Sequence, residues 1–303
     1  MAKLTIGMLT FDDFHGVYFT LQAIRMYHKE VLDQIEMLVI DNNPDGPHGQ
    51  EVRNLINGLP NTHYSAVRGK SSSTLKNLIF ELSNTEYTMC MDCHVLLEQG
   101  SLAKLLQFYE AYPACDDLLQ GPLLAENGDV IATEMMPAFR GQNFGIWHTE
   151  EQGKIATNNA YEIAMHGMGM FVCRTTAWPR FTSGTNGFGS EEGVLHEKFR
   201  LLGRKCYCLP FLRWVHRFGR PDGVKYPILA KDKVRNLVLA FREMQLPLEI
   251  IDQYWQDKLQ PANLEESRRL MSDLLFWAES LPPSPFMQRS SPPFLGKPIQ
   301  LLD

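Results

Sequence analysis

The sequence predicts an α/β fold: a mainly parallel, Rossmann-like sheet flanked by helices, followed by a C-terminal helical extension. Three observations favour this class. Short apolar runs alternate with amphipathic segments through the first part of the chain, as in consecutive βαβ units. Polar turn sequences end these runs, above all Asp-Asn-Asn-Pro-Asp-Gly at residues 41–46. No internal repeat interrupts the alternation.

The first half of the chain supplies the alternating elements. The predicted strands span residues 4–10, 35–40, 62–67 and 87–91. The predicted helices span residues 16–29, 50–57, 72–82 and 100–112. Ligands of such sheets bind beyond the carboxyl ends of the strands. The residues that follow each strand are therefore the first candidates for a site.

The second half of the chain is less regular. Strands are predicted at residues 118–124, 129–133, 167–174, 205–209 and 212–216, and a helix at 193–202. Glycines at 167 and 169 predict a close approach to the backbone there. Residues 140–166 hold little periodicity and predict a mobile loop, and residues 229–280 predict two or three amphipathic helices. We therefore predict a sheet domain at 1–225, a helical extension at 226–281 and a proline-rich tail at 282–303.

The composition is that of a soluble globular protein, with 44% hydrophobic and 21% charged residues among 303. The first residues lack a secretory-signal pattern, and no run reaches the roughly 18 apolar residues of a membrane span. We expect a cytoplasmic protein without a membrane partner. The net charge of -6 argues against a wholly basic nucleic-acid-binding surface but leaves room for a local basic site.

The six cysteines lie in or beside apolar runs, which favours reduced, mostly buried thiols. A structural zinc site is the alternative, because Cys90 and Cys93 form a Cys-x-x-Cys pattern that Cys206 and Cys208 would complete. On a regular strand Cys90 and Cys93 face opposite ways, which argues against joint ligation.

The triplet Asp92-Cys93-His94 ends the fourth predicted strand. Because side chains alternate along a strand, Asp92 and His94 are expected on one face and Cys93 in the core. A carboxylate with an imidazole suits Mn²⁺, with zinc, iron and cobalt as competitors. His216, after another apolar stretch, is a third candidate ligand. The alternative is that Asp92 caps a turn, His94 is a core histidine and His216 lies on the surface.

The pair Glu191-Glu192 follows the turn sequence Asn-Gly-Phe-Gly-Ser and is predicted to open a helix, with Ser190 as its N-cap. One of the two carboxylates is a candidate general base or a ligand for substrate hydroxyls. The alternative is that both only stabilise the positive end of the helix dipole.

Several side chains that follow the predicted strands are suited to a nucleotide. The candidates for base, ribose and diphosphate contacts are Thr10, Phe11, Asp12, Asp41, Arg68 and Lys70, together with Asp92. The alternative for each is ordinary turn chemistry.

Candidates for binding a second substrate lie in two segments. Trp147 and His148 belong to the predicted mobile loop, which we expect to close over a ligand. Arg217 and Arg220 belong to a basic run that would contact an anionic acceptor, or the phosphates of a donor. The alternative is a solvated basic face.

The order of these motifs resembles that of the GT-A glycosyltransferases over roughly residues 4–220. The most similar patterns are those of the family 2 enzymes and the polypeptide N-acetylgalactosaminyltransferases. The latter bind manganese through an Asp-x-His triplet and a distant histidine, which implies that Asp92, His94 and His216 bind Mn²⁺ or Mg²⁺. Family 2 enzymes carry Glu-Asp at a helix start, which implies that Glu191 or Glu192 is the catalytic residue.

The resemblance implies transfer of a hexose from a nucleotide-sugar, with UDP as the expected nucleotide, to an acceptor hydroxyl. Similarity to phage-type transferases implies a hydroxymethyl-pyrimidine in phage DNA as acceptor, in the cytoplasm of a bacterial host. A protein, glycan or small-molecule acceptor is the alternative. Two other functions stay open: a sugar nucleotidyltransferase, although Phe-Asp-Asp-Phe at 11–14 replaces its usual Gly-rich loop, and a non-catalytic sugar-binding protein.

The sequence departs from the usual patterns at two points. The triplet is Asp-x-His instead of the commoner Asp-x-Asp, and Glu-Glu replaces Glu-Asp. The departures leave open which glutamate acts, and whether the anomeric configuration is inverted or retained.

Overall fold

The computed structural model describes residues 2–68, 73–140, 143–220, 223–251, 269, 272 and 300–301. Its main sheet has eight strands in the order β11-β13-β6-β12-β4-β1-β2-β3. The parallel half consists of β1 (Leu4–Thr10), β2 (Ile35–Asp41), β3 (Thr62–Ala66) and β4 (Tyr87–Asp92). The other half consists of β12 (Met170–Arg174), antiparallel to β4, and then β6 (Leu118–Gln120), β13 (Cys206–Cys208) and β11 (Tyr161–Glu162).

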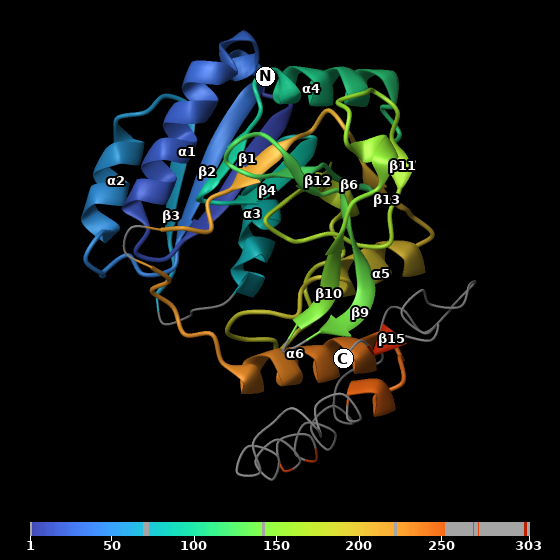
Figure 1. Cartoon of the computed structure of the whole chain (residues 1–303). Coiled ribbons are helices and arrows are strands. Elements are labelled where there is room, and N and C mark those ends of the chain that lie inside the picture. Colours follow the sequence, from blue (N-terminus) through green and yellow to red (C-terminus); the bar gives the residue numbers. More distant parts are fainter. Residues whose placement is uncertain are drawn as a thin grey trace.

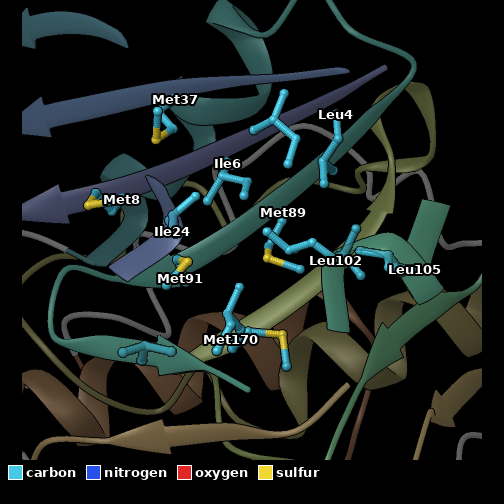
Figure 2. Close-up of a cluster of buried hydrophobic side chains, with 14 of the residues drawn as sticks. Leu4, Ile6, Met8, Ile24, Met37, Met89, Met91, Leu102, Leu105 and Met170 are labelled. Carbon is cyan, nitrogen blue, oxygen red and sulfur yellow. The ribbon is translucent and has the colours of Figure 1, made fainter. Parts of the chain in front are cut away.

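Helices cover both faces of this sheet, as predicted (Figure 1). One face packs against α1 (Phe14–Tyr27), α2 (Gly49–Asn57) and α4 (Ser101–Ala111), and the other against α3 (Lys76–Leu82) and α5 (Val194–Leu201). The alternation of β1 explains the two layers: Leu4, Ile6 and Met8 enter the first core, which is rich in methionine (Figure 2). Gly7 faces α3, where an added Cβ would lie 2.1 Å from Ile79. That helix therefore packs directly on the strand backbone.

A second, four-stranded sheet lies beside the first in the order β5-β14-β7-β8. Its strands are β5 (Val95–Leu97), β14 (Trp214–His216), β7 (Leu123–Leu124) and β8 (Val130–Ala132). The strand predicted at 118–124 is wrong as one element, because it divides between the two sheets. The division falls at Gly121, where a Cβ would meet the Leu212 carbonyl oxygen at 1.8 Å.

The mobile loop predicted at 140–166 is wrong for much of its length. A hairpin forms from β9 (Glu134–Arg140) and β10 (Asn143–His148), and β11 lies further along. The strand pattern was hidden by a bulge at Gly145, whose φ of +101° and crowding by two methionine side chains suit only glycine. The hairpin's Phe139 and Phe144 pack with α6 (Ala230–Glu243) in a third core.

The C-terminal extension is described in part. Its first helix, α6, matches the prediction, and most of residues 252–299 lie outside the described residues. Within the predicted tail, β15 (Gln300–Leu301) pairs in parallel with β9. The domain boundaries at 225 and 281 stay predictions. Among the helices described, none is long and apolar enough to cross a membrane.

Candidate metal centre and adjoining groove

Asp92, His94 and His216 converge beyond the carboxyl end of β4. The strand ends at Asp92, within one residue of its predicted end, and a turn through Cys93 and His94 leads into β5, so the strand alternation expected through the triplet stops at Asp92. The strand β14 runs antiparallel to β5 and places His216 opposite Val95, next to this turn. The Nε2 atoms of the two histidines lie 3.2 Å apart. Asp92 Oδ2 lies 3.5 Å from His216 Nε2 and 3.9 Å from His94 Nε2.

Two predictions about the surroundings of the triad agree with this geometry. Cys93 is buried, with 3% of its surface exposed. Gly169 permits the close approach expected of it, since an added Cβ would lie 2.9 Å from Trp214 and 3.2 Å from His216. Gly167 does the same for Trp147, whose ring would lie 2.3 Å from an added Cβ.

The protonation of His94 suits a metal ligand. Its Nδ1 lies 3.2 Å from Asp13 Oδ2. Burial raises the pKa of Asp13, but hydrogen bonds from His94 and the Gly16 amide outweigh it and lower the pKa to about 2. The ionised carboxylate accepts the Nδ1 proton, which directs the Nε2 lone pair toward His216 and Asp92. Burial also lowers the pKa of His94, so the ring is neutral at neutral pH.

Lys76 completes the surroundings of Asp92. Its buried ammonium lies 3.2 Å from Asp92 Oδ1 and donates to the Met168 carbonyl at 2.9 Å. Burial lowers the pKa of Lys76, but the charge of Asp92 outweighs it and raises the pKa overall. Burial likewise raises the pKa of Asp92, yet the Lys76 charge and the hydrogen bond from His216 hold it well below the ordinary value. Neither Asp13 nor Lys76 was predicted from the sequence.

These groups line a cavity of about 330 Å³ at the sheet edge. Of the residues proposed from the sequence, the cavity contains Thr10, Phe11, Asp92, His94 and Arg220. The Thr10 hydroxyl is buried and has no hydrogen-bond partner among the described atoms. Further lining residues that were not proposed from the sequence are Asn42, Asn186, Gly187, Phe188, Tyr226 and Asp232.

Three other donor candidates do not line this cavity. Asp12, at a φ of +51°, accepts from the Asn43 side chain, and Asp41 is buried beneath the turn. Asp41 accepts from the Asn43 amide at 2.9 Å and from the Tyr64 hydroxyl at 2.8 Å. Arg68 pairs with Asp45 at 2.6 Å. Their contacts are those of turn chemistry, and Lys70 lies outside the described residues.

A groove of about 480 Å³ adjoins the cavity, and Phe188 lines both. Trp147 stands in it with 40% of its surface exposed, together with Arg140, Lys233 and Glu192. His148 does not line the groove. Its Nδ1 lies 3.0 Å from Glu134 and 3.9 Å from Glu150.

Glu191 and Glu192 precede α5 instead of opening it, so the predicted helix start with Ser190 as N-cap is wrong. Ser190 has a φ of +70°, its hydroxyl donates to the Lys233 carbonyl, and the helix begins at Val194. Glu191 is buried, and its Oε1 has no partner among the described atoms. Glu192 faces the groove. Burial raises the pKa of both carboxyls, and the negative charge of Asp92 adds to the shift of Glu192.

The basic residues on either side of β14 in the sequence do not form one surface. Arg213 pairs with Glu98 at 3.3 Å, and the Arg217 guanidinium lies 5.4 Å from the centre of the Phe19 ring. Arg220 alone enters the cavity, where it donates to His94 Nε2 at 2.8 Å. The predicted grouping of Arg217 with Arg220 is therefore not observed.

The zinc alternative gains no support. All six cysteines are free, and within the described part of the chain no cluster of three potential ligands includes Cys90, Cys206 or Cys208. The cluster of Asp92, His94 and His216 is one such group. The other two such clusters among the described residues are Asp13 with Cys93 and His94, and Glu134 with His148 and Glu150.

No protein-family model and no curated protein matches the sequence, but solved structures are similar in fold. The crystal structure of GalNAc-T7 with UDP, GalNAc and Mn²⁺ is 11% identical, covers 90% of this chain and 55% of its own, and gives a TM-score of 0.61. This chain therefore spans about half the length of GalNAc-T7.

This chain covers a larger share of two further structures. The mannosyltransferase PcManGT from Pyrobaculum calidifontis, with GDP-Man and Mn²⁺, is 13% identical over 94% of this chain and 77% of its own, with a TM-score of 0.51. S. aureus TarS with UDP-GlcNAc is 12% identical over 91% and 73%, with a TM-score of 0.50. At these identities the likeness shows the fold, which is the GT-A glycosyltransferase fold, and it confirms the predicted fold class.

Proposed function

We propose that the protein is a metal-dependent glycosyltransferase, which moves a sugar from a nucleotide-sugar to an acceptor hydroxyl. The observation that carries this proposal is the cluster of Asp92, His94 and His216 at the carboxyl end of a GT-A sheet, where Asp92 and His94 line a cavity. One carboxylate and two imidazoles suit Mn²⁺, with Mg²⁺ as the alternative. The similar structures bind UDP, UDP-GlcNAc or GDP-Man, two of them with Mn²⁺, which supports the same donor class here.

The cavity offers suitable contacts for each part of a donor. The unpartnered Thr10 hydroxyl and the Phe11 ring stand at the end of β1, where a nucleoside would bind. Lys76 and Arg220 bring two positive charges toward the metal centre and would bind a diphosphate. A bound divalent ion would neutralise charge on the leaving nucleoside diphosphate.

The adjoining groove is the proposed acceptor site. If transfer inverts the sugar, the acceptor oxygen forms a bond to the anomeric carbon while the bond from that carbon to the phosphate oxygen breaks. Glu192 faces the groove and would take the proton of the acceptor hydroxyl. If transfer retains the configuration, Glu192 would instead position the acceptor. Glu191 is buried and does not line the groove, which makes it the weaker candidate for either role.

The groove favours an acceptor that carries a ring and a negative charge. Trp147 exposes an aromatic surface, and within the described residues neither Arg140 nor Lys233 forms an ion pair with a carboxylate. A hydroxymethyl-pyrimidine in phage DNA, glycosylated from a UDP-hexose in the host cytoplasm, is the specific acceptor that we propose. A protein, glycan or small-molecule acceptor is the alternative, and gel shifts with modified and unmodified duplex DNA at two salt concentrations would separate them.

The test of the proposed function is a thermal-shift screen of UDP-sugars and GDP-mannose with and without MnCl₂. Ligand at 100 times its Kd stabilises a protein by about 2.7 kcal/mol. We expect one nucleotide-sugar to raise the melting temperature only when Mn²⁺ is present, and slow release of UDP or GDP to accompany it. Turnover excludes a non-catalytic sugar-binding protein, and pyrophosphate production from a nucleoside triphosphate and a sugar phosphate would indicate a nucleotidyltransferase. Absence of any Mn²⁺-dependent stabilisation would overturn the proposal.

A further inference from the structure

We infer that Lys76 makes metal binding conditional on the donor: it opposes a lone divalent cation at the metal centre and favours the cation together with a diphosphate. The inference rests on the proposed function, because it concerns the same site. The buried ammonium of Lys76 would couple the binding of the metal ion to the binding of the donor.

The first observation is how firmly the ammonium is held. Lys76 is 6% exposed, and its Nζ is fixed between Asp92 Oδ1 at 3.2 Å and the Met168 carbonyl at 2.9 Å. Met168 lies just before β12, the strand that pairs with β4. The ammonium is thus anchored between neighbouring segments of the main sheet, and it cannot move far when a ligand arrives.

The second observation is how the carboxylate of Asp92 is divided. Oδ1 faces Lys76, whereas Oδ2 faces the two imidazoles. Asp92 is therefore presented to a cation through one oxygen. Asp92, His94 and His216 would give a metal ion three protein ligands, and oxygens of the donor would supply others, since Mn²⁺ and Mg²⁺ prefer six.

The third observation is the sign of the charges. A cation bound to Oδ2 is separated from the Lys76 ammonium by a single carboxylate, and like charges at that separation repel. Lys76 also lines the cavity, where the negative diphosphate of a donor would meet it. The same ammonium therefore weakens binding of the bare ion and strengthens binding of the ion with its nucleotide, which is a coupling between the two ligands.

The affinity for Mn²⁺ alone separates two possible roles of Lys76, because they change it in opposite directions. If Lys76 only orients Asp92, its removal should weaken the binding of Mn²⁺ alone. If Lys76 acts through its charge, Lys76→Met should bind Mn²⁺ alone more tightly than the wild type.

The experiment measures the Kd of Mn²⁺ from the electron paramagnetic resonance signal of the free ion, with no nucleotide, with UDP and with GDP. We expect Lys76→Met to bind Mn²⁺ alone about tenfold more tightly and to lose most of the enhancement that UDP or GDP gives the wild type. Lys76→Arg, which keeps the charge, should behave as the wild type.

Lys198→Met is the matched control. Lys198 is also buried in an ion pair, 2.8 Å from Glu243, and donates to the Arg180 carbonyl at 3.0 Å, but it does not line the cavity. It should lower the melting temperature without changing either Mn²⁺ affinity. Equal or weaker binding of Mn²⁺ alone by Lys76→Met would overturn the inference while leaving the proposed function intact. A wild type that binds no Mn²⁺ even with UDP or GDP would overturn both.

Discussion

Two histidine pairs each bring one ring near Trp214, and they differ in their chemistry. His94 and His216 face each other through their Nε2 atoms at 3.2 Å, beside Asp13 and Asp92, and His94 lines a cavity. His166 and His196 form the second pair.

The second pair is wholly buried. His196 Nε2 accepts from the His166 amide at 2.9 Å and contacts the side chain of Gln120 at 2.6 Å. Within the described residues neither ring of this pair meets a carboxylate. The difference teaches that neighbouring carboxylates and an open cavity, more than the histidines themselves, mark a metal centre.

The largest effect should come from Glu192, which faces the groove next to the cavity of the first pair. Glu192→Gln removes the proposed base and should lower kcat by about 10²- to 10⁴-fold while Mn²⁺-dependent donor binding is kept. Because burial raises the pKa of Glu192 above that of an ordinary glutamate, activity should rise with pH as this group ionises, through a midpoint above the usual glutamate range. Full activity in Glu192→Gln, or an unchanged acid limb of its pH–rate profile, would remove Glu192 from the mechanism.

The direct comparison of the two pairs is His216→Ala against His196→Ala. Loss of a group that only supports a ligand already costs about 10- to 100-fold in metal affinity. His216→Ala, which removes a ligand, should therefore weaken Mn²⁺ binding by at least about 100-fold. His196→Ala should instead lower stability by about 1–3 kcal/mol and keep Mn²⁺ affinity. Isothermal titration with Mn²⁺ and urea unfolding separate the two, and the reverse pattern would refute the assignment.

Of the two pairs in the described structure, Asp13 contacts only the first. It fixes the tautomer of His94 but is not one of the three proposed metal ligands. Asp13→Asn should weaken Mn²⁺ binding by about 10- to 100-fold. Its effect should vanish in a His94→Ala background, which a double-mutant cycle measures. Additive losses in that cycle would show that Asp13 acts elsewhere.

The smallest effect concerns the contribution of His166, in the second pair, to the unfolding free energy of the protein. Burial lowers the pKa of His166 from 6.5 to about 3, so the unfolded state binds a proton first as pH falls. The stability contribution present above pH 6.5 is thus lost progressively toward pH 3. Between pH 6.5 and 5 the loss amounts to about 2 kcal/mol for one group. His166→Gln should flatten this part of the curve of unfolding free energy against pH, and an equally steep curve would contradict the account.

Much of the fold could be predicted from the sequence where periodicity is regular. The strands β1, β2, β3 and β4 lie close to their predicted positions because apolar residues there are continuous and turns are marked. The hairpin β9–β10 could not be predicted, because the Gly145 bulge breaks its alternation. The irregular turn before α5 was also missed, since positive φ values at Gly189, Ser190 and Gly193 replace a normal helix cap.

The site was predictable where residue type alone suggests metal chemistry. The triad of Asp92, His94 and His216 was proposed from its residue types and from the resemblance, and the fold brings the three together. Asp13 and Lys76 were missed because an aspartate at a helix N-cap and a lysine in a helix are ordinary residues in a sequence. Their importance depends on the tertiary contacts to His94 and Asp92.

The first pair, and not the second, is proposed to bind the metal ion together with the donor. Pulsed electron paramagnetic resonance of Mn²⁺ bound to the wild type with UDP or GDP tests this proposal, because the spectrum reports nitrogen nuclei that ligate the ion. We expect coupling to two imidazole nitrogens, reduced to one in His216→Ala and unchanged in His196→Ala. Bound Mn²⁺ without nitrogen coupling, or coupling that survives unchanged in His216→Ala, would contradict it.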